Sequence, residues 1–155
     1  MEEIPLSKDK VAIVDKDDFF ELIKYKWYFN KGYAARDLWL GDKKKKTLLM
    51  HRTLMKTPNG YDTDHINQNK LDNRKSNLRI CTRSQNSVNK GLQKNNKSGY
   101  KGVHFFKQTK RWMATIYINK KRVHLGYFSK AEEAAKVYNK ALKEHYGSFA
   151  LLNKI

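Results

Sequence analysis

At 155 residues the chain is long enough for one ordinary domain or for two small ones. Its 33 lysines and arginines against 15 acidic residues give a formal net charge of +18, which points to a polyanion as partner, because binding phosphates releases condensed counterions. No apolar run approaches the length of a membrane span, and Cys81, the only cysteine, excludes an internal disulfide.

The basic charge is unevenly distributed along the chain. Residues 1–89 carry 18 basic and 12 acidic side chains, whereas residues 90–155 carry 15 basic and only 3 acidic ones. The acidic residues therefore lie mainly in the front part, where a catalytic metal ion would need them. Packing inside a ribosome-like or histone-like assembly is the plain alternative to an enzyme.

The start of the chain bears on its compartment. The segment Met1-Glu2-Glu3 is acidic and is not followed by an apolar signal core. The sequence also has no Cys-x-x-Cys pair that could hold a structural zinc ion. We therefore expect a protein that stays in a reducing cytoplasm and is not secreted.

The front part alternates short strands with helical segments. The pattern predicts strands at residues 10–14, 32–36 and 47–50, a short amphipathic helix at 19–27 behind a cap at 15–18, and a helical turn at 51–55. The turn before the third strand holds four lysines, Lys43–Lys46, which either contact phosphate or form a solvated hairpin tip. His51 either supports a functional site or phosphate, or is a packed structural histidine.

The strongest functional signal lies between Asp64 and Asn86. Asp64 and His65 end a short predicted strand, a polar loop follows, and Asn77 opens a second short strand. A helix with a capping-box start then carries Asn86 about one turn in. The order of strand, loop, strand and helix predicts that a carboxylate, an imidazole and two amides converge.

These residue types are the ones that phosphodiester hydrolysis requires. His65 can take a proton from water near neutral pH, and Asp64 with Asn86 offers two oxygen ligands suited to Mg²⁺. The side-chain oxygen of Asn77 can accept from the second imidazole nitrogen and fix the ring. Taken singly, Asp64 could cap a turn and Asn77 could satisfy loop backbone groups. Together, in a basic chain, they favour a nuclease.

The segments Asp64-His65-Ile66-Asn67, Leu71-Asp72-Asn73-Arg74-Lys75-Ser76-Asn77-Leu78-Arg79 and Gln85-Asn86 resemble the HNH endonuclease family, in its phage and intron homing branch. In this resemblance His65 is the first His, Asn77 the central Asn, and Asn86 stands where the last His often lies, still as a metal ligand. The resemblance covers roughly residues 47–90, and it implies a bacterial or phage-infected cell as the setting. It implies a ββα-metal unit with one divalent ion, Mg²⁺ or Mn²⁺ in its place, and products with a 5′ phosphate and a 3′ hydroxyl. The neighbouring basic residues, either phosphate contacts or solvated surface, are Arg74, Lys75, Arg79 and Arg83.

The rear part has a different character. Residues 91–98 are polar and basic and indicate a linker. Alternation then predicts strands at 100–106, 111–118 and 121–128, and Ser129 with Glu132 predicts a capping box before a helix that Gly147 ends. In the middle strand, the residues expected to face the helix are Trp112, Ala114, Ile116 and Ile118, and those expected on the other face are Arg111, Met113, Thr115 and Tyr117.

The segments Ser98–Val103, Trp112–Ile116 and Arg122–Phe128 resemble the ethylene-response-factor DNA-binding domain of plants, over about residues 98–153. That family lays its three-stranded sheet in the major groove, with the helix behind. The positions that match its DNA contacts are Lys101, His104, Thr115, Tyr117, Arg122 and His124. Several of them are Arg or Trp in the plant domains, so we expect modest sequence preference and strong salt dependence. Four other residues are expected in the core: Val103, Trp112, Leu125 and Phe128.

These observations predict an α+β protein of two small domains. Residues 1–90 form an HNH nuclease domain with its ββα-metal core at about 60–90, residues 91–98 a basic linker, and residues 99–155 a domain of three antiparallel strands packed on one helix. We expect a metal-dependent endonuclease that nicks or cuts double-stranded DNA as a monomer or weak dimer. A non-catalytic DNA-binding regulator with a degenerate nuclease domain is the alternative, and an RNA- or ribosome-binding protein is a third.

Overall fold

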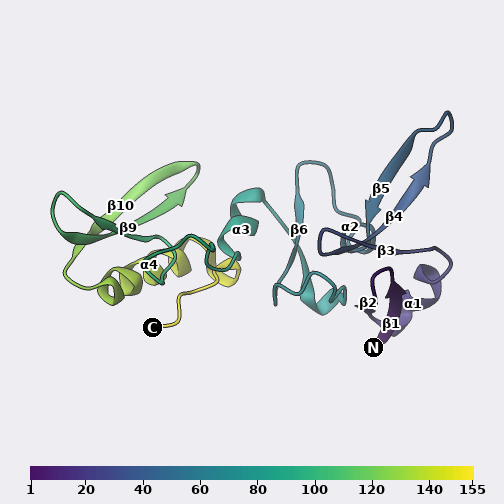
Figure 1. Ribbon diagram of the computed structural model, residues 1–155, viewed down its shortest axis with the longest axis horizontal. Helices are drawn as coiled ribbons and strands as arrows, with labels where there is room; N and C mark the ends of the chain where they lie inside the picture. Colours follow the sequence, from purple (N-terminus) through teal and green to yellow (C-terminus); the bar gives the residue numbers. More distant parts are fainter. The chain divides into compact units, whose positions relative to one another are not determined.

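The computed structural model describes residues 1–155, which form two compact units, Met1–Arg83 and Ser84–Ile155 (Figure 1). Both units combine helices with small antiparallel sheets, so the α+β class is confirmed. The boundary between the units lies earlier than the predicted end of the front domain at residue 90. The segment at 89–98 therefore belongs to the second unit. None of the helices has the length and apolar character that a bilayer crossing requires.

The first unit contains three small antiparallel sheets, formed by β1 with β2, by β3, β4 and β5 in that order, and by β6 with β7. Its elements are β1 (Glu2–Leu6), β2 (Lys10–Val14), α1 (Lys16–Leu22), β3 (Tyr28–Asn30), β4 (Tyr33–Trp39), β5 (Lys45–Leu49), α2 (Met50–Leu54), β6 (Asp62–His65), the 3-10 turn η1 (Lys75–Asn77) and β7 (Leu78–Cys81). The sequence pattern predicted these elements except β1, β3 and η1, and α1 both begins and ends earlier than expected.

The core of the first unit is built on its N-terminal hairpin. The buried residues of this core are Ile4, Leu6, Ala12, Val14, Leu22, Trp27, Ala34 and Met50. The indole N–H of Trp27 donates to the Leu22 carbonyl at 2.8 Å, so the polar end of this buried ring is satisfied. Strand β2 also reaches the polar loop of the HNH-like motif, because the Ile13 N–H donates to Leu71 and the Asn73 N–H donates to Ile13. The N-terminal hairpin therefore holds the loop in place.

The second unit is a three-stranded antiparallel sheet, in the order β10-β9-β8, with the long helix α4 against it (Figure 1). Its elements are α3, which begins at the unit boundary (Arg83–Val88), β8 (Val103–Phe106), β9 (Arg111–Ile118), β10 (Lys121–Phe128), α4 (Ala131–Tyr146) and the 3-10 turn η2 (Gly147–Phe149). Ala114 of β9 and Ala134 and Ala135 of α4 are fully buried, and these small side chains let the helix approach the sheet closely. The predicted three strands and helix are therefore confirmed.

The core of this unit contains the residues that alternation assigned to it. Val103 is buried, and Trp112, Leu125 and Phe128 pack against the same cluster. The face of β9 that points away from α4 is only partly open to solvent. Met113 and Thr115 are each only 8 % exposed.

The start of α4 differs from the prediction by one residue. The N-cap is Lys130, and the carboxylate of Glu133, not of Glu132, accepts from the Lys130 N–H and from the Ser129 hydroxyl. Ser129 is therefore still part of the cap, but from one position outside the helix. The helix ends as predicted at Gly147, whose φ of +51° lies in the left-handed region.

Candidate active site

The β6–β7 hairpin positions the predicted carboxylate and imidazole. The register pairs Asp64 with Arg79 and His65 with Leu78. Asp64 is 6 % exposed and His65 is 5 % exposed, so both functional groups are buried in the wall of the first unit. Burial of this kind costs free energy unless the polar atoms have partners, so the neighbours of these two side chains define the site.

Asp64 is held by Arg79, directly opposite on β7. The Arg79 Nε and Nη2 atoms donate to the Asp64 Oδ2 atom at 2.9 and 2.7 Å. A charge-assisted contact of this geometry fixes the carboxylate and offsets its charge. Arg79 was predicted as a phosphate contact, but the structure commits its guanidinium to the carboxylate instead.

The side-chain amide that faces the His65 ring is Asn73, whereas Asn77, the predicted orienting residue, turns its oxygen to the Asn67 N–H. The Asn73 side-chain amide donates to the Leu71 carbonyl at 3.0 Å, and this turns its Oδ1 atom toward the His65 Nε2 atom at 3.4 Å. Since the Asn73 oxygen can only accept, this contact favours the tautomer of His65 that carries its proton on Nε2. Burial lowers the pKa of His65, and the Asn73 and Asp64 contacts oppose that effect.

Asn77 stabilises the loop between β6 and β7, which follows His65 in the sequence. Its Oδ1 atom accepts from the Asn67 N–H at 3.0 Å, and its Nδ2 atom donates to the Asp72 carbonyl at 2.8 Å. Both ends of the amide are thus used inside the loop that joins β6 to β7. The contacts of Asn77 are thus those of a side chain that satisfies loop backbone groups, which was the alternative to an orienting residue.

Asp72 is the buried anchor of the same loop. It is 2 % exposed, and its two oxygens accept from the Arg74 Nε and Nη2 atoms at 2.7 and 2.6 Å. The Arg74 hydrogen bonds are the main cause that lowers the pKa of Asp72, so the carboxylate stays charged. Arg74 was also predicted as a phosphate contact, and it too is committed to a carboxylate. Of the three predicted arginines only Arg83 is simply exposed.

Two aromatic rings, those of His51 and Tyr33, lie beside the imidazole of His65, and the sequence had raised only His51 as a possible support for the site. His51 of α2 lies with its ring centroid 5.0 Å from that of His65, edge to face, and Tyr33 of β4 lies 5.0 Å from His51. Burial is the main cause that lowers the pKa of His51 to about 3, so this ring is neutral. His51 is therefore a buried, uncharged neighbour of the His65 ring. The packed-histidine alternative holds.

The donor set can be tested against a divalent metal ion. The structure contains no group of three or more His, Cys, Asp or Glu side chains that could enclose a metal, which argues against a closed structural zinc site. Mg²⁺ keeps several waters and takes one or two carboxylates together with substrate phosphates. The fixed Asp64 carboxylate fits that requirement. Asn86 lies on α3 in the second unit, so its pairing with Asp64 remains a prediction.

Five of the six predicted DNA-contact residues of the second unit share one sheet face, and the sixth, Lys101, lies outside the strands. The register pairs Tyr117 with Arg122 and Thr115 with His124, and residues paired across antiparallel strands lie on the same face. Tyr117, Arg122 and His124 are exposed, whereas Thr115 is buried. The Arg122 Nη2 atom lies 3.1 Å from the His104 Nε2 atom. Burial and then Arg122 lower the pKa of His104, so its nitrogen accepts from the guanidinium.

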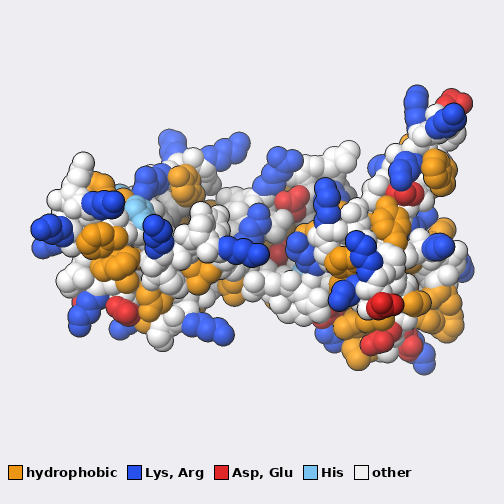
Figure 2. All heavy atoms as spheres, viewed as in Figure 1, with side chains coloured by type: hydrophobic (Ala, Val, Ile, Leu, Met, Phe, Trp, Pro, Cys, Tyr) orange, Lys and Arg blue, Asp and Glu red, His pale blue; other side chains and the backbone are white.

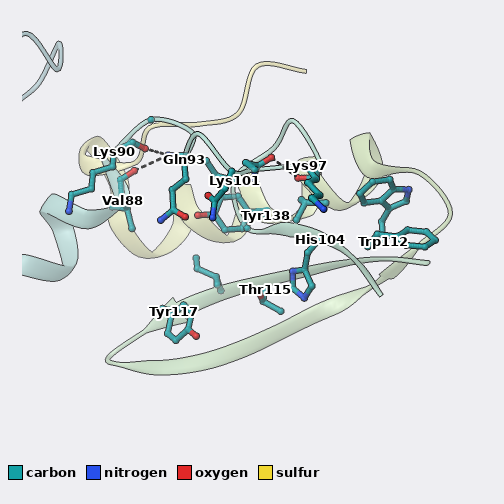
Figure 3. Close-up of a pocket in the computed structure, with 18 of the residues that line it drawn as sticks. Val88, Lys90, Gln93, Lys97, Lys101, His104, Trp112, Thr115, Tyr117 and Tyr138 are labelled. Carbon is teal, nitrogen blue, oxygen red and sulfur yellow. Dashed lines mark hydrogen bonds between the residues drawn. The ribbon is translucent and has the colours of Figure 1, made fainter. Parts of the chain in front are cut away.

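Lys101 has a structural function that the resemblance did not predict. Its Nζ atom donates to the Val88 and Lys90 carbonyls at 3.0 and 3.1 Å, at the end of α3 (Figure 3). Burial lowers its pKa to about 8. The ammonium thus ties the end of α3 and Lys90 to the turn that leads into β8. A groove of about 920 Å³ lies between the 89–98 segment and the sheet, with His104 and Tyr117 in its wall (Figure 3).

Comparison with known proteins adds independent information. The family model for HNH endonuclease matches residues 56–88, which contain β6, η1 and β7. An uncharacterized HNH endonuclease of Acanthamoeba polyphaga mimivirus is 34 % identical over 154 residues, 96 % of this chain and 77 % of the relative. The chain belongs to the HNH endonuclease family. A second similar protein, Protein 3.8 of Escherichia phage T7, is 33 % identical over 93 residues, 60 % of this chain and 76 % of that protein.

No solved structure matches this HNH protein. The matched segment holds both of the buried groups, Asp64 and His65, and the two amides Asn73 and Asn77 that shape their surroundings. The relatives support the HNH part of the chain, and they give no support for the plant-type DNA-binding domain at its C-terminal end.

Proposed function

We propose that this protein is a metal-dependent endonuclease that hydrolyses phosphodiester bonds of double-stranded DNA. The observation that carries the proposal is the pair Asp64 and His65 on β6, one fixed by Arg79 and the other oriented by Asn73. Family membership implies a nuclease, and the basic charge of the chain suits a nucleic-acid substrate.

His65 is the general base of the proposed reaction. With Nε2 turned toward Asn73, the Nδ1 atom takes a proton from water as the water oxygen bonds to phosphorus. The bond from phosphorus to the 3′ oxygen breaks, and that oxygen takes a proton from solvent. The products are a 5′ phosphate and a 3′ hydroxyl. The buried, neutral His51 ring keeps water away from one side of the imidazole.

Asp64 is the proposed ligand of one divalent ion, Mg²⁺ or Mn²⁺, with Asn86 as the second ligand predicted from the motif. When bound, such an ion offsets the negative charge that develops on the scissile phosphate and the leaving oxygen. Arg79 holds the carboxylate ready for this function. Arg83, which is exposed beside the motif, is the proposed phosphate contact of the first unit.

The second unit is the proposed DNA-binding module. The support is its resemblance to the ethylene-response-factor domain, together with an exposed sheet face that carries Tyr117, Arg122 and His124. Because the residues that read bases in the plant domains are largely replaced, we assign this face to positioning the enzyme on the DNA backbone. One active site per chain cuts one strand, so a monomer nicks.

Cleavage of supercoiled plasmid with Mg²⁺ or Mn²⁺ at low salt tests the proposal. His65→Ala should lower the cleavage rate by about 10²–10⁴-fold, the contribution of a general base. Asp64→Ala should also abolish cutting, and both variants should keep the DNA affinity of the unchanged chain. His145→Ala removes an exposed histidine of α4 and is the matched control. Plasmid that stays intact with the unchanged protein in both metals would favour the DNA-binding regulator instead.

A further inference from the structure

The β4–β5 hairpin continues well beyond the sheet to which it belongs. Strand β3 pairs with β4 only from Tyr33 to Ala35, whereas β4 and β5 remain paired from Arg36 with Leu48 out to Trp39 with Lys45. Residues 36–48, here called the outer ribbon, are therefore two-stranded. Figure 1 shows the outer ribbon projecting past the other elements of the first unit.

The tip of the outer ribbon has a defined turn. The Leu40 N–H donates to the Lys44 carbonyl at 2.9 Å, and the Lys44 N–H donates to the Gly41 carbonyl at 2.8 Å. Gly41, Asp42 and Lys43 all have positive φ, which closes the turn tightly. The lysines of the tip are thus presented from a shaped hairpin end.

The outer ribbon exposes apolar side chains that the core of its unit does not use. Trp39 is 68 % exposed, Leu40 is 60 % exposed, and Leu38 is 39 % exposed. A large aromatic ring left in water at a hairpin end contributes little to folding, because the burial that stabilises such rings is missing. Exposed aromatic rings beside cations are a feature of surfaces that bind nucleic acid.

The charge of the outer ribbon is mainly positive. Lys45 pairs with Asp37 at 2.8 Å, and Asp37 also accepts from the Tyr28 and Thr47 hydroxyls. The other three lysines of the ribbon, Lys43, Lys44 and Lys46, are exposed and form no ion pair. Figure 2 shows lysine or arginine side chains, with an acidic side chain beside them, at the projecting tip.

We propose that the outer ribbon is a DNA-contacting arm that enters a groove of duplex DNA, an inference that takes its partner from the proposed function. A two-stranded β-ribbon has the width that the major groove of B-DNA admits. Lys43, Lys44 and Lys46 lie against phosphates on the two sides of the groove, and Trp39 packs on deoxyribose or a base edge. The arm adds sequence-independent affinity from the first unit, separate from the sheet of the second unit.

The test is DNA binding by the full chain in EDTA, so that the duplex stays uncut. Lys43→Gln, Lys44→Gln and Lys46→Gln are combined in one variant. The matched control combines Lys10→Gln, Lys16→Gln and Lys26→Gln, which removes the same charge from exposed lysines elsewhere in the first unit. Anisotropy of a labelled duplex of mixed sequence is measured over a series of salt concentrations.

The ribbon variant should lower the slope of log affinity against log salt by about 2–3, because each lost phosphate contact contributes about 0.9. The control variant should change the slope by less than about 1. Trp39→Ala should weaken binding about fivefold to tenfold without changing the slope, as expected for one aromatic contact.

Equal salt slopes for the ribbon variant and the control variant would overturn the inference. These outcomes are distinguishable from failure of the proposed function. A chain that binds DNA through the ribbon but leaves plasmid intact would refute the nuclease alone. A chain that cuts plasmid with an unchanged ribbon slope would refute the arm alone.

Discussion

His51 and His65 contact each other edge to face, yet they differ in what surrounds their nitrogens. His65 has the Asn73 oxygen facing its Nε2 atom, whereas the Nδ1 atom of His51 has no hydrogen-bond partner in the buried wall. A protonated His51 would place an unpaired charge in an apolar environment, which is costly. The neutral ring is therefore a packing residue whose chemistry limits the pH range of the fold.

This environment predicts an acid-sensitive first unit. The pKa of His51 is about 3 in the folded chain and about 6.5 when unfolded, so between these values the unfolded chain binds the extra proton. Its contribution to stability is thus fully present above about pH 6.5 and is lost progressively as the pH falls toward 3. The lowered pKa of His65 acts in the same direction.

Urea unfolding between about pH 4.5 and pH 7 measures the effect. Through His51, the free energy of unfolding should fall by up to about 1.4 kcal/mol for each unit by which the pH is lowered in this range. His51→Phe keeps a ring in the same space and should flatten the dependence, whereas His145→Gln, at an exposed position, should not. A pH dependence that is unchanged in His51→Phe would show that another group carries it.

At the residue scale, the sequence predicted the buried carboxylate and imidazole but not their partners. Asp64 and His65 are neighbours in a recognisable motif, and one short strand, β6, carries both of them. The choice between Asn73 and Asn77 depends on which backbone carbonyl each amide meets, and spacing does not fix that. Arg79 was missed as a partner of Asp64 because the pairing depends on the strand register.

Among the elements, periodicity predicted best where strands and helices are long. β9, β10 and α4 each show a clear repeat, and their bounds agree closely with expectation. β1 was missed because it is acidic and contains Pro5, which an edge strand tolerates, and β3 because it has three residues. The three residues of β3 are too few for alternation to distinguish a strand from a loop.

The junction before β8 gives a prediction about the second unit. Gly102 has a φ of +71°, and a Cβ atom there would lie 2.1 Å from the Tyr138 ring of α4. Tyr138 is buried with Ile116 and Leu142, so it has little room to move. Gly102→Ala should therefore destabilise the second unit by about 2–4 kcal/mol, through overpacking and backbone strain together.

Hydrogen exchange of the β8–β10 amides measures this loss, because partial opening of the sheet raises their exchange rates. Gly99→Ala is the matched control, since Gly99 has a similar φ of +78° but no atom within 4 Å of the added methyl group. It should cost only about 1 kcal/mol. Equal protection of these amides from exchange in the two alanine variants would mean that the Tyr138 ring moves aside at no cost in stability.

For the whole molecule, the charge distribution suggests a division between cutting and binding. The carboxylates that shape the motif, Asp64 and Asp72, lie in the first unit, and the second unit holds only 3 acidic residues against 15 basic ones. Figure 2 shows lysine and arginine side chains spread over the surface of each unit. The uneven distribution of charge could be predicted from the sequence, because the net charge of a segment is a sum over its residues and does not depend on the fold.

Steady-state cleavage separates the two functions. Arg122→Gln removes an exposed cation from the sheet face of the second unit, so it should raise KM for plasmid and lower the salt slope of binding by about 0.9, while kcat stays unchanged. His65→Ala should do the reverse, with kcat lost and affinity kept. Lys136→Gln, on the exposed side of α4, removes the same charge away from that face and should change neither constant. If Arg122→Gln instead lowered kcat at saturating DNA with KM unchanged, the second unit would have a part in the chemical step and the proposed division would be wrong.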